Sequence, residues 1–377
     1  MISLSQVPTP ACIIDFDIFK RNCQRMLAVA ESEQIVLRPH VKTLKSLQAA
    51  KYYAPSSMPV TVSTLAEARY FASAGYTDIL YAVGIAPNKL NQLDAILRLA
   101  ADFTVIADSL AAVNTLIDFA PQYSQSLAVM LEVDVDDHRA GLLPESDELI
   151  ACARAIQNAS NLRFRGVMTH AGGSYDCLDS SARQAMAKQE CERISAAAGQ
   201  LARHGIQCDI VSAGSTPTAL AGVSHQGITE LRAGVYATFD CVMAGLGVCQ
   251  VTDIAMSVLT CVIGHQRSKN WVIVDAGWMA LSRDQGTAGH HTDCGYGLVC
   301  DINGQVLDGW YVKATNQEHG IICHRDNIEP PEALFSYGQV LRILPVHACA
   351  TAAQYQQYHV VDDTLTVSQQ WSRISGW

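Results

Sequence analysis

The sequence predicts a (β/α)8 barrel followed by an all-β domain. Eight short runs of β-branched and apolar residues lie between residues 35 and 232, and longer amphipathic stretches separate them. Several runs are largely apolar, such as LAVMLEV and CDIVSA, which is typical of strands covered on both faces. After about residue 250 the pattern changes to short strands between Gly, Asn and Asp turns. We therefore expect a barrel over residues 16–248 and a β domain formed by residues 1–15 and 249–377.

The predicted barrel strands are residues 35–41, 59–63, 78–83, 103–107, 127–133, 164–169, 209–213 and 228–232. The amphipathic stretches between them include residues 65–74, 88–100, 147–157 and 181–204. Eight strands, each followed by a helix, is the number that closes this barrel. A doubly wound open sheet is the alternative, but no Gly-x-Gly-x-x-Gly follows the first strand to favour it.

The predicted strands of the second domain are residues 258–265, 271–275, 296–301, 339–346 and 358–361. Turn sequences such as INGQ and VDAGW lie between them. Residues 11–15 also have the composition of a strand and precede the first barrel helix. We expect this early strand to pair with the C-terminal sheet.

Length, composition and charge limit the classes of protein. The 377 residues exceed the usual size of one hydrophobic core, and 49% hydrophobic with 16% charged residues describes a globular enzyme. A formal charge of -10 argues against a general nucleic-acid binder. The thirteen cysteines are scattered without a CxxC pair, which favours reduced thiols and a cytoplasmic location. Neither a signal peptide nor a spanning helix is visible, so we expect no membrane partner.

The sequence R-P-H-V-K-T, residues 38–43, carries the candidate catalytic residue Lys42. It lies at the carboxyl end of the first predicted strand, where active sites of this barrel are built. Partial burial favours the neutral, nucleophilic form of an amine. His40 shares the strand face with Lys42, which favours a polar pocket, and we expect Lys45 to be the exposed lysine. The alternative is a surface lysine that only extends its charge into water.

Two glycine turns after the seventh and eighth strands are candidate phosphate sites. The first contains Gly214, Ser215 and Thr216, and the second Gly234, Val235 and Tyr236. Glycine lets the backbone approach a ligand closely, and hydroxyl groups can donate hydrogen bonds to a phosphate. Loops after these two strands commonly bind phosphate in this barrel. Two ordinary turns remain the alternative.

Three further residues at strand ends are candidates for cofactor binding. Arg139 follows the fifth strand, and it could contact an anionic ring oxygen or pair with the neighbouring acids. His170 and Tyr175 lie in T-H-A-G-G-S-Y after the sixth strand. Tyr175 could face a ring nitrogen, or it could be an ordinary loop aromatic.

The sequence H-A-C near the C-terminus is a candidate metal site. If His347 and Cys349 lie on an extended segment, their side chains face the same side and can share one ion. Nitrogen and sulfur ligands together select zinc over magnesium or calcium. Two protein ligands leave room for water and substrate oxygens. A chance His-x-Cys pair is the alternative in a chain with so many cysteines.

Taken together, these residues resemble those of the fold-type III pyridoxal 5′-phosphate (PLP) enzymes, in the branch of D-serine dehydratase and D-threonine aldolase. Five motifs carry the resemblance in the same order over nearly the whole chain: R-P-H-x-K-T, S-x-G-S-T-P-T, R-A-G-V-Y-x-x-F-D, D-A-G-W and P-x-H-x-C-A-T. Dehydratases of D-serine and D-threo-3-hydroxyaspartate carry His and Cys in the closing motif, as this chain does, whereas the aldolases have His and Asp.

The resemblance implies an alanine racemase-like barrel with PLP on Lys42, phosphate held by the two glycine turns, and zinc on His347 and Cys349. It further implies a homodimer that acts on a small 3-hydroxy D-amino acid. Lys42 would remove the α-proton while zinc helps the β-hydroxyl to leave, giving a keto acid and ammonia. A tyrosine at the pyridine nitrogen would make the ring a weaker electron sink, so the metal would be needed.

Three alternatives remain open. A retro-aldolase would share every part of the site except the proton removed. An amino-acid racemase would need a second base from the β domain, for which Tyr296 and Tyr311 are candidates. A non-catalytic PLP-binding protein would consist of the barrel alone, and the additional β domain with its H-A-C motif argues against it.

Overall fold

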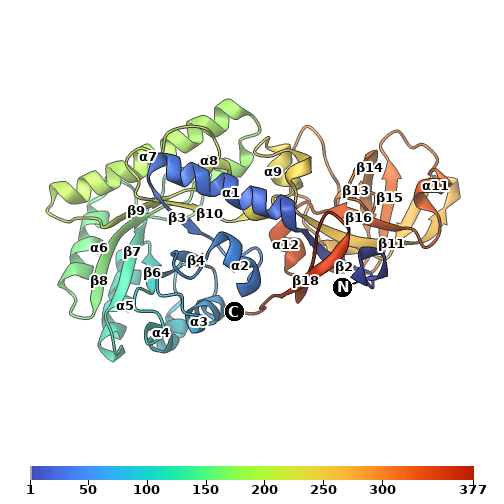
Figure 1. The fold of residues 1–377 in the computed structure, drawn as a ribbon. Helices are drawn as coiled ribbons and strands as arrows, with labels where there is room; N and C mark the ends of the chain where they lie inside the picture. The colour runs from blue at the N-terminus through green and yellow to red at the C-terminus, as the bar shows by residue number, and fades with distance from the viewer. Residues whose placement is uncertain (1) are drawn as a thin grey trace. The chain divides into compact units, whose positions relative to one another are not determined.

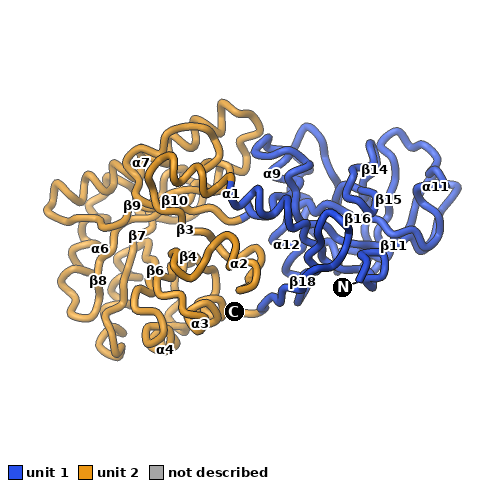
Figure 2. The backbone as a smooth tube through the Cα atoms, in the orientation of Figure 1, with its two compact units in different colours: residues 1–24, 235–375 blue, residues 25–234, 376–377 orange. Residues whose placement is uncertain are grey.

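The computed structural model describes residues 2–377, which form two compact units. Unit 1 comprises residues 1–24 and 235–375, and unit 2 comprises residues 25–234 and 376–377 (Figure 2). The helix α1 (Phe16–Glu33) carries the chain from unit 1 into unit 2. The domain limits given above stay a prediction.

Unit 2 is the eight-stranded parallel barrel that the sequence predicts (Figure 1). Its strands are β3 (Val36–Pro39), β4 (Val60–Val62), β5 (Ile79–Tyr81), β6 (Thr104–Ala107), β7 (Leu127–Glu132), β8 (Leu162–Met168), β9 (Ile210–Ala213) and β10 (Glu230–Ala233). Their order is β3-β10-β9-β8-β7-β6-β5-β4, and a parallel bridge between His40 and Thr61 joins the two ends. Each predicted barrel strand overlaps one of these, so this part of the prediction is confirmed.

The helices of unit 2 lie outside the barrel (Figure 1), and most of them begin at a residue whose side chain caps the helix. They are α2 (Leu47–Tyr53), α3 (Leu65–Ser73), α4 (Leu93–Leu97), α5 (Leu110–Phe119), α6 (Asp147–Asn158), α7 (Ser180–Arg203) and α8 (Thr216–Ala219). Thr64 caps α3 and Ser146 caps α6, each accepting a hydrogen bond from a first-turn N–H. These caps fix where each helix starts, and therefore how long each loop at the carboxyl end of a strand is.

Buried ion pairs close the opposite end of the barrel, where the strands begin. Arg38 is 1% exposed, and it donates to Glu230 at 2.7 Å and to Asp78 at 2.9 Å. Arg165 donates to the second oxygen of Asp78 at 2.6 Å. A buried charge needs such partners to offset its desolvation. Arg38, the arginine of R-P-H-V-K-T, therefore stabilises the barrel. The candidate catalytic residue of this motif is Lys42, which follows Arg38 in the chain.

Unit 1 is built on one ten-stranded sheet in the order β1-β18-β17-β2-β11-β12-β15-β14-β13-β16, with β11 also paired to β16. The strands are β1 (Ile2–Ser3), β2 (Ala11–Asp15), β11 (Met256–Gln266), β12 (Trp271–Val274), β13 (Leu298–Cys300), β14 (Val306–Thr315), β15 (Gly320–His324), β16 (Val340–Leu344), β17 (Gln357–Val361) and β18 (Thr366–Ser372). The early strand β2 pairs with β11 and β17, which confirms that it joins the C-terminal sheet.

Short helices interrupt this sheet: α9 (Cys241–Gly245), α10 (Trp278–Leu281), α11 (Glu332–Phe335) and α12 (Ala348–Ala352). The helix α12 corrects one expectation. His347 is its N-cap residue and Cys349 lies in its first turn, so the H-A-C segment is not extended. The predicted strand 339–346 ends earlier because Pro345 has no N–H to donate, so the ladder of β16 stops at Leu344.

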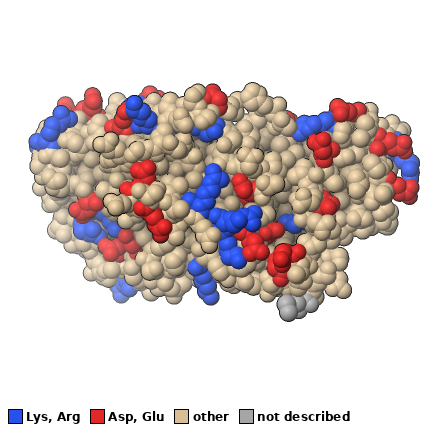
Figure 3. Space-filling view, turned by 45° about the horizontal axis from the view of Figure 1, so that its top comes forward, with Lys and Arg blue, Asp and Glu red and all other residues tan. Residues whose placement is uncertain are grey.

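Surface charge and helix hydropathy relate to two classes of partner, nucleic acids and membranes. On the face drawn in Figure 3, Lys and Arg side chains gather in a group near the centre with Asp and Glu side chains beside them, and both signs of charge occur elsewhere on the face. Within residues 2–377, every helix is too short or too polar to cross a bilayer.

Candidate active site

Lys42 is the third residue after β3 and is half-buried, and no residue of 2–377 binds its amine by a hydrogen bond or an ion pair. Two imidazoles lie near it. His40 Nε2 is 3.2 Å from Ser63 Oγ, and His170 Nδ1 is 3.5 Å from the carbonyl oxygen of Gly214. An amine without an acidic partner at the carboxyl end of a barrel strand is available for chemistry.

Both imidazoles stay neutral. Burial, together with the charges of Lys42 and Arg232, lowers the pKa of His40 well below its usual value. The same causes lower the pKa of His170 to about 3. Positive charge near this strand end therefore belongs to Lys42 and the arginines, and an anionic ligand would balance it.

Lys45 is not the exposed lysine that we expected. Its side chain is 14% exposed, and its Nζ lies 3.4 Å from Glu67 Oε2, a carboxylate with no exposed surface. Glu67 also accepts a hydrogen bond from Thr64 Oγ1 at 2.9 Å. The cause of the error is that Lys45 has φ +47, a turn conformation that the lysine spacing does not reveal. Lys45 is bound to an acid, and Lys42 is not.

Arg232 is a residue that sequence reasoning missed, although it begins R-A-G-V-Y. It is 5% exposed, and it donates to Ser212 Oγ at 2.5 Å and to the carbonyl oxygen of Thr169. Burial lowers the pKa of its guanidinium in spite of the neighbouring Glu230. Arg232 thus fixes the ends of β8, β9 and β10 relative to one another and adds positive charge beside the histidines.

The first glycine turn fits a phosphate group. Gly214 has φ +117, and a Cβ there would lie 2.6 Å from the Arg232 carbonyl oxygen, so only glycine fits. Ser215 caps α8, and its Oγ is also 3.0 Å from Ser174 Oγ. Thr216 Oγ1 is buried without a hydrogen-bond partner. A buried hydroxyl with no partner costs free energy unless a ligand supplies one.

The second glycine turn continues from unit 2 into unit 1. Gly234 ends unit 2, and a Cβ there would lie 3.2 Å from His40 Cβ. Val235 and Tyr236 belong to the short 3-10 helix η5 (Val235–Ala237) of unit 1, and both are buried. Their predicted contact with phosphate stays a prediction.

The remaining candidates lie after β7 and β8. Arg139 donates to Glu132 at 3.1 Å with its side chain 61% exposed, which is the acid pairing left open above. Tyr175 lies in the 3-10 helix η4 (Gly172–Asp176), and its ring centroid is 6.3 Å from that of His170. The strand ends thus bring His170 and Tyr175 together.

These features fit PLP. An aldehyde needs an unpaired amine, which Lys42 offers, and an anionic ring and phosphate need the positive charge that Arg232 and Lys42 supply. The phosphate oxygens in turn offer an acceptor to the unpartnered hydroxyl of Thr216. Gly214 leaves room for a close approach of the ligand to the backbone.

The candidate metal ligands meet in unit 1. The side chains of His347 and Cys349 are hydrogen-bonded, and His347 Nδ1 donates to Asp284 Oδ2 at 2.6 Å. Burial alone would lower the pKa of His347, but Asp284 and Cys349 together raise it to about 11. The hydrogen bond from His347 in turn lowers the pKa of Asp284. Within residues 2–377, no group of three or more His, Cys, Asp or Glu side chains is placed to hold a metal ion. A nitrogen–sulfur pair with open positions fits zinc.

Sequence reasoning missed two acids beside this pair. Asp284 lies in a loop, sixty-three residues before His347. Asp240 ends the motif R-A-G-V-Y-A-T-F-D and is 1% exposed; its carboxylate accepts from Met243 N and from Ala348 N, both at 2.9 Å. Asp240 therefore caps α9 and holds the peptide between the two candidate ligands. The R-A-G-V-Y motif could have drawn attention to Asp240, but Asp284 belongs to none of the motifs.

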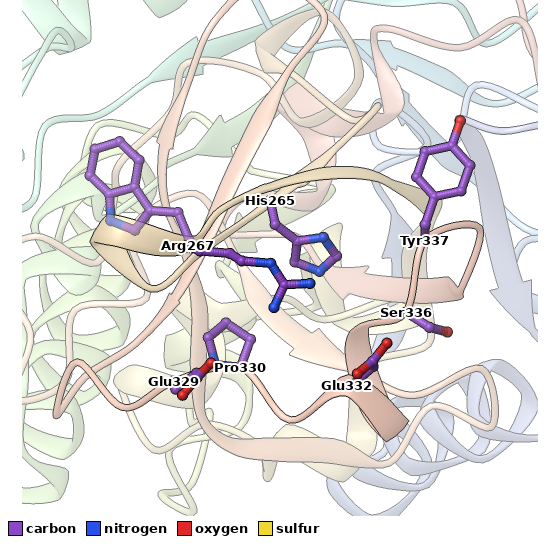
Figure 4. A pocket seen from close by; sticks show the side chains of 8 residues that line it. His265, Arg267, Glu329, Pro330, Glu332, Ser336 and Tyr337 are labelled. Atoms are coloured by element: carbon purple, nitrogen blue, oxygen red, sulfur yellow. The ribbon is translucent and has the colours of Figure 1, made fainter.

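A pocket elsewhere in unit 1 has a different character (Figure 4). Its cavity volume is about 130 Å³, and it is lined by His265, Arg267, Trp271, Glu329, Pro330, Glu332, Ser336 and Tyr337. His265 Nε2 donates to the carbonyl oxygen of Phe335 at 2.7 Å. The lining contains none of the predicted site residues.

Two family models match the chain. The alanine racemase N-terminal domain matches residues 14–241, and the serine dehydratase domain matches residues 255–361. The matched residues thus include Lys42 and both glycine turns in the first domain, and His347 and Cys349 in the second.

Curated relatives match over nearly their whole length. D-threo-3-hydroxyaspartate dehydratase of Delftia sp. is 44% identical, with 100% of this chain and 99% of the relative covered. D-serine dehydratase of Dictyostelium discoideum is 29% identical, with 99% and 98% covered. D-threonine aldolase of Arthrobacter sp. is 27% identical, with 96% and 90% covered.

Solved structures agree with these relatives. The structure of the Delftia sp. HT23 dehydratase superposes with a TM-score of 0.95 at 45% identity and covers 100% of both chains. A mutant of D-threo-3-hydroxyaspartate dehydratase in the metal-free form superposes with a TM-score of 0.96 at 44% identity, again over 100% of both chains.

Proposed function

This chain belongs to the family of PLP enzymes in which an alanine racemase N-terminal domain precedes a serine dehydratase domain, and from this we propose that it is a zinc-dependent D-amino acid dehydratase. Its substrate is a 3-hydroxy D-amino acid, D-serine or D-threo-3-hydroxyaspartate. The products are a keto acid and ammonia. The observation that carries the proposal is the amine of Lys42, which has no acidic partner at the end of β3 in a chain that also holds the His347–Cys349 pair.

PLP, when bound, supplies an electron sink for the negative charge that develops at the α-carbon of the substrate. Lys42 holds the cofactor. Gly214, Ser215, Thr216, Gly234, Val235 and Tyr236 hold its phosphate, and His40, Arg139, His170 and Tyr175 surround its ring. Among these, Thr216 offers a buried hydroxyl without a partner, and Gly214 leaves no room for a side chain.

Lys42 moves the proton. When it does not hold the cofactor, the amine of Lys42 would be free to accept the α-proton of the substrate. No carboxylate within residues 2–377 pairs with it, so a proton taken by Lys42 is not shared with an acid. The neutral imidazoles of His40 and His170 leave the positive charge at this strand end to the arginines and Lys42, which favours an anion beside them.

His347 and Cys349 would hold the zinc ion. Zinc, when bound, would supply Lewis-acid polarisation to an oxygen such as the β-hydroxyl that must leave. A site with two protein ligands would have room for that oxygen and for water. Cys349 also argues for the dehydratase over the aldolase, because the resembling aldolases carry Asp at this position.

The assembly and location follow the same reasoning. We propose a homodimer, because this fold type usually completes its site with a partner chain. The location we propose is the cytoplasm, because all thirteen cysteines are free thiols in the structure. We retain domain limits of 16–248 for the barrel and of 1–15 with 249–377 for the β domain.

The test is to incubate the enzyme separately with D-serine, D-threonine and D-threo-3-hydroxyaspartate and to identify the products. A keto acid with equimolar ammonia is the expected result for the preferred substrate. Glycine with an aldehyde or glyoxylate would identify an aldolase instead. Appearance of the L-enantiomer without ammonia would identify a racemase.

A further inference from the structure

We propose that Asp284 is the positioning residue of the metal site: it orients His347 so that the Nε2 atom, and not Nδ1, binds the metal. This inference rests on the proposed function, which places the metal on His347 and Cys349. The observation that carries it is the hydrogen bond of 2.6 Å between His347 Nδ1 and Asp284 Oδ2.

The hydrogen bond decides which ring nitrogen is available. A carboxylate only accepts, so the proton shared with Asp284 stays on Nδ1. A metal that binds this ring then takes the place of the proton on Nε2, across the ring from Asp284. A second partner of this kind fixes both the tautomer and the orientation of a metal-binding histidine, and it makes the ligand nitrogen more basic.

Asp284 is itself held by its own loop. Its Oδ1 accepts from Gly286 N at 2.9 Å, while its Oδ2 faces His347. Its backbone N–H donates to Ser282 Oγ at 3.3 Å. One carboxylate oxygen thus anchors the loop and the other fixes the imidazole. Within residues 2–377 no three-residue metal group is present, which agrees with a role in orienting rather than in binding the ion.

The backbone beside the ligands is fixed independently. Asp240 Oδ2 accepts from Ala348 N, so the peptide between His347 and Cys349 does not depend on Asp284. Loss of the Asp284 carboxylate should therefore release the imidazole ring and leave the turn in place. Metal affinity is the property that such a change affects first.

The experiment compares metal affinity in the PLP-loaded wild type, Asp284→Ala, Asp284→Asn and Asp301→Ala. Zinc is titrated in competition with a chromophoric chelator, and cobalt(II) absorption reports on the imidazole–thiolate ligand set. Asp301 is the matched control: its Oδ1 accepts from Gln305 N at 2.9 Å and its Oδ2 from Asn303 at 3.1 Å, so it anchors a turn of the same unit without a histidine.

We expect Asp284→Ala to weaken zinc binding about 10–100-fold, as for other outer-shell partners of metal-binding histidines. Asp284→Asn keeps an acceptor oxygen but loses the charge, so its loss should be smaller and still measurable. Asp301→Ala should bind zinc as the wild type does. All variants should retain the yellow colour of the bound cofactor.

Two outcomes separate this inference from the proposed function. If the wild type binds neither zinc nor cobalt at His347 and Cys349, the metal-dependent function is wrong and the inference falls with it. If the wild type binds zinc and Asp284→Ala binds it equally well, the inference alone is overturned. Should Asp284→Ala fail to fold, Asp284→Asn decides: wild-type affinity and an unchanged cobalt spectrum would overturn the proposal.

Discussion

The candidate sites of the two units are built in different ways. In unit 2 every proposed residue follows the carboxyl end of a strand: Gly214 and Gly234 come directly after β9 and β10, and Lys42 is the third residue after β3. In unit 1 the metal pair lies at the start of a five-residue helix, and its partner Asp284 comes from a distant loop. Strand periodicity therefore locates the first site, whereas the second depends on contacts between remote segments.

Among the substitutions in unit 2, Lys42→Ala should have the largest effect on activity. It removes the amine that holds the cofactor and moves the α-proton, so turnover of the preferred substrate should fall about 1,000-fold or more. Borohydride reduction followed by peptide mapping measures where the cofactor is attached. Lys45→Ala is the control, because Lys45 is already paired with Glu67. If the cofactor is found attached to Lys45 in the Lys42→Ala variant, the assignment of Lys42 as the lysine that holds the cofactor is contradicted.

Loss of the metal is the corresponding test in unit 1. Chelation should stop turnover while the cofactor stays bound through Lys42. Cys349→Ala should weaken zinc binding by about 100-fold, since the thiolate is one of only two proposed protein ligands. Cys349→Asp should favour harder ions such as manganese and reduce elimination. A wild type stripped of all metal that still converts D-serine to pyruvate at full rate would contradict the role of the metal in elimination.

Thr216→Val tests the proposed phosphate contact in unit 2. It removes the buried hydroxyl without a partner and keeps its shape, so PLP should dissociate about 10-fold more readily. The cofactor affinity is measured by fluorescence titration of the cofactor-free protein. Thr61→Val is the control, because Thr61 also has a buried hydroxyl without a partner but lies within β4. Equal losses in the two variants would argue against a specific phosphate contact.

Acid should destabilise the protein through the neutral imidazoles of unit 2. The pKa of His170 is about 3, so the unfolded chain binds a proton there that the folded chain does not. Stability from this group is complete above about pH 6.5 and is lost as the pH falls toward 3, at about 1.4 kcal/mol per pH unit. Urea unfolding between about pH 7 and 5 measures this slope.

His170→Gln should make that slope shallower, because glutamine does not titrate. His204→Gln, at the exposed end of α7, should leave it unchanged. An equal slope in His170→Gln and the wild type would mean that other groups, such as His40, account for the acid sensitivity.

The sequence predicts most of unit 2 because nearly all residues of its strands are buried. β7 has no exposed residue, and such a run has an unmistakable composition. β14 was missed because its residues alternate in exposure and include Asp308, Gly309 and Lys313, so only its pairing with β13 and β15 defines it as a strand.

The site residues divide in the same way. Lys42 could be found from its place after a strand, but the pairing of Lys45 with Glu67 depends on a left-handed turn that the sequence does not mark. His347 and Cys349 were predicted as a pair on the assumption of an extended segment, and this assumption is wrong. The two residues lie at the start of a helix. Asp284 could not be found, because its partner is sixty-three residues away and its loop has no periodic pattern.

The backbone N–H of Ala348 donates to the carboxylate of Asp240. The conformation of the turn that carries His347 and Cys349 is therefore fixed by a backbone group and not by the side chains of the two ligands. A peptide N–H at position 348 is offered by every residue type except proline, so the turn does not depend on which side chain stands at position 349. The ligand at position 349 can therefore be substituted during evolution while the backbone conformation of the turn stays the same. A lineage can therefore move between thiolate and carboxylate at this position, and between the metals that they prefer, without rebuilding the fold around them.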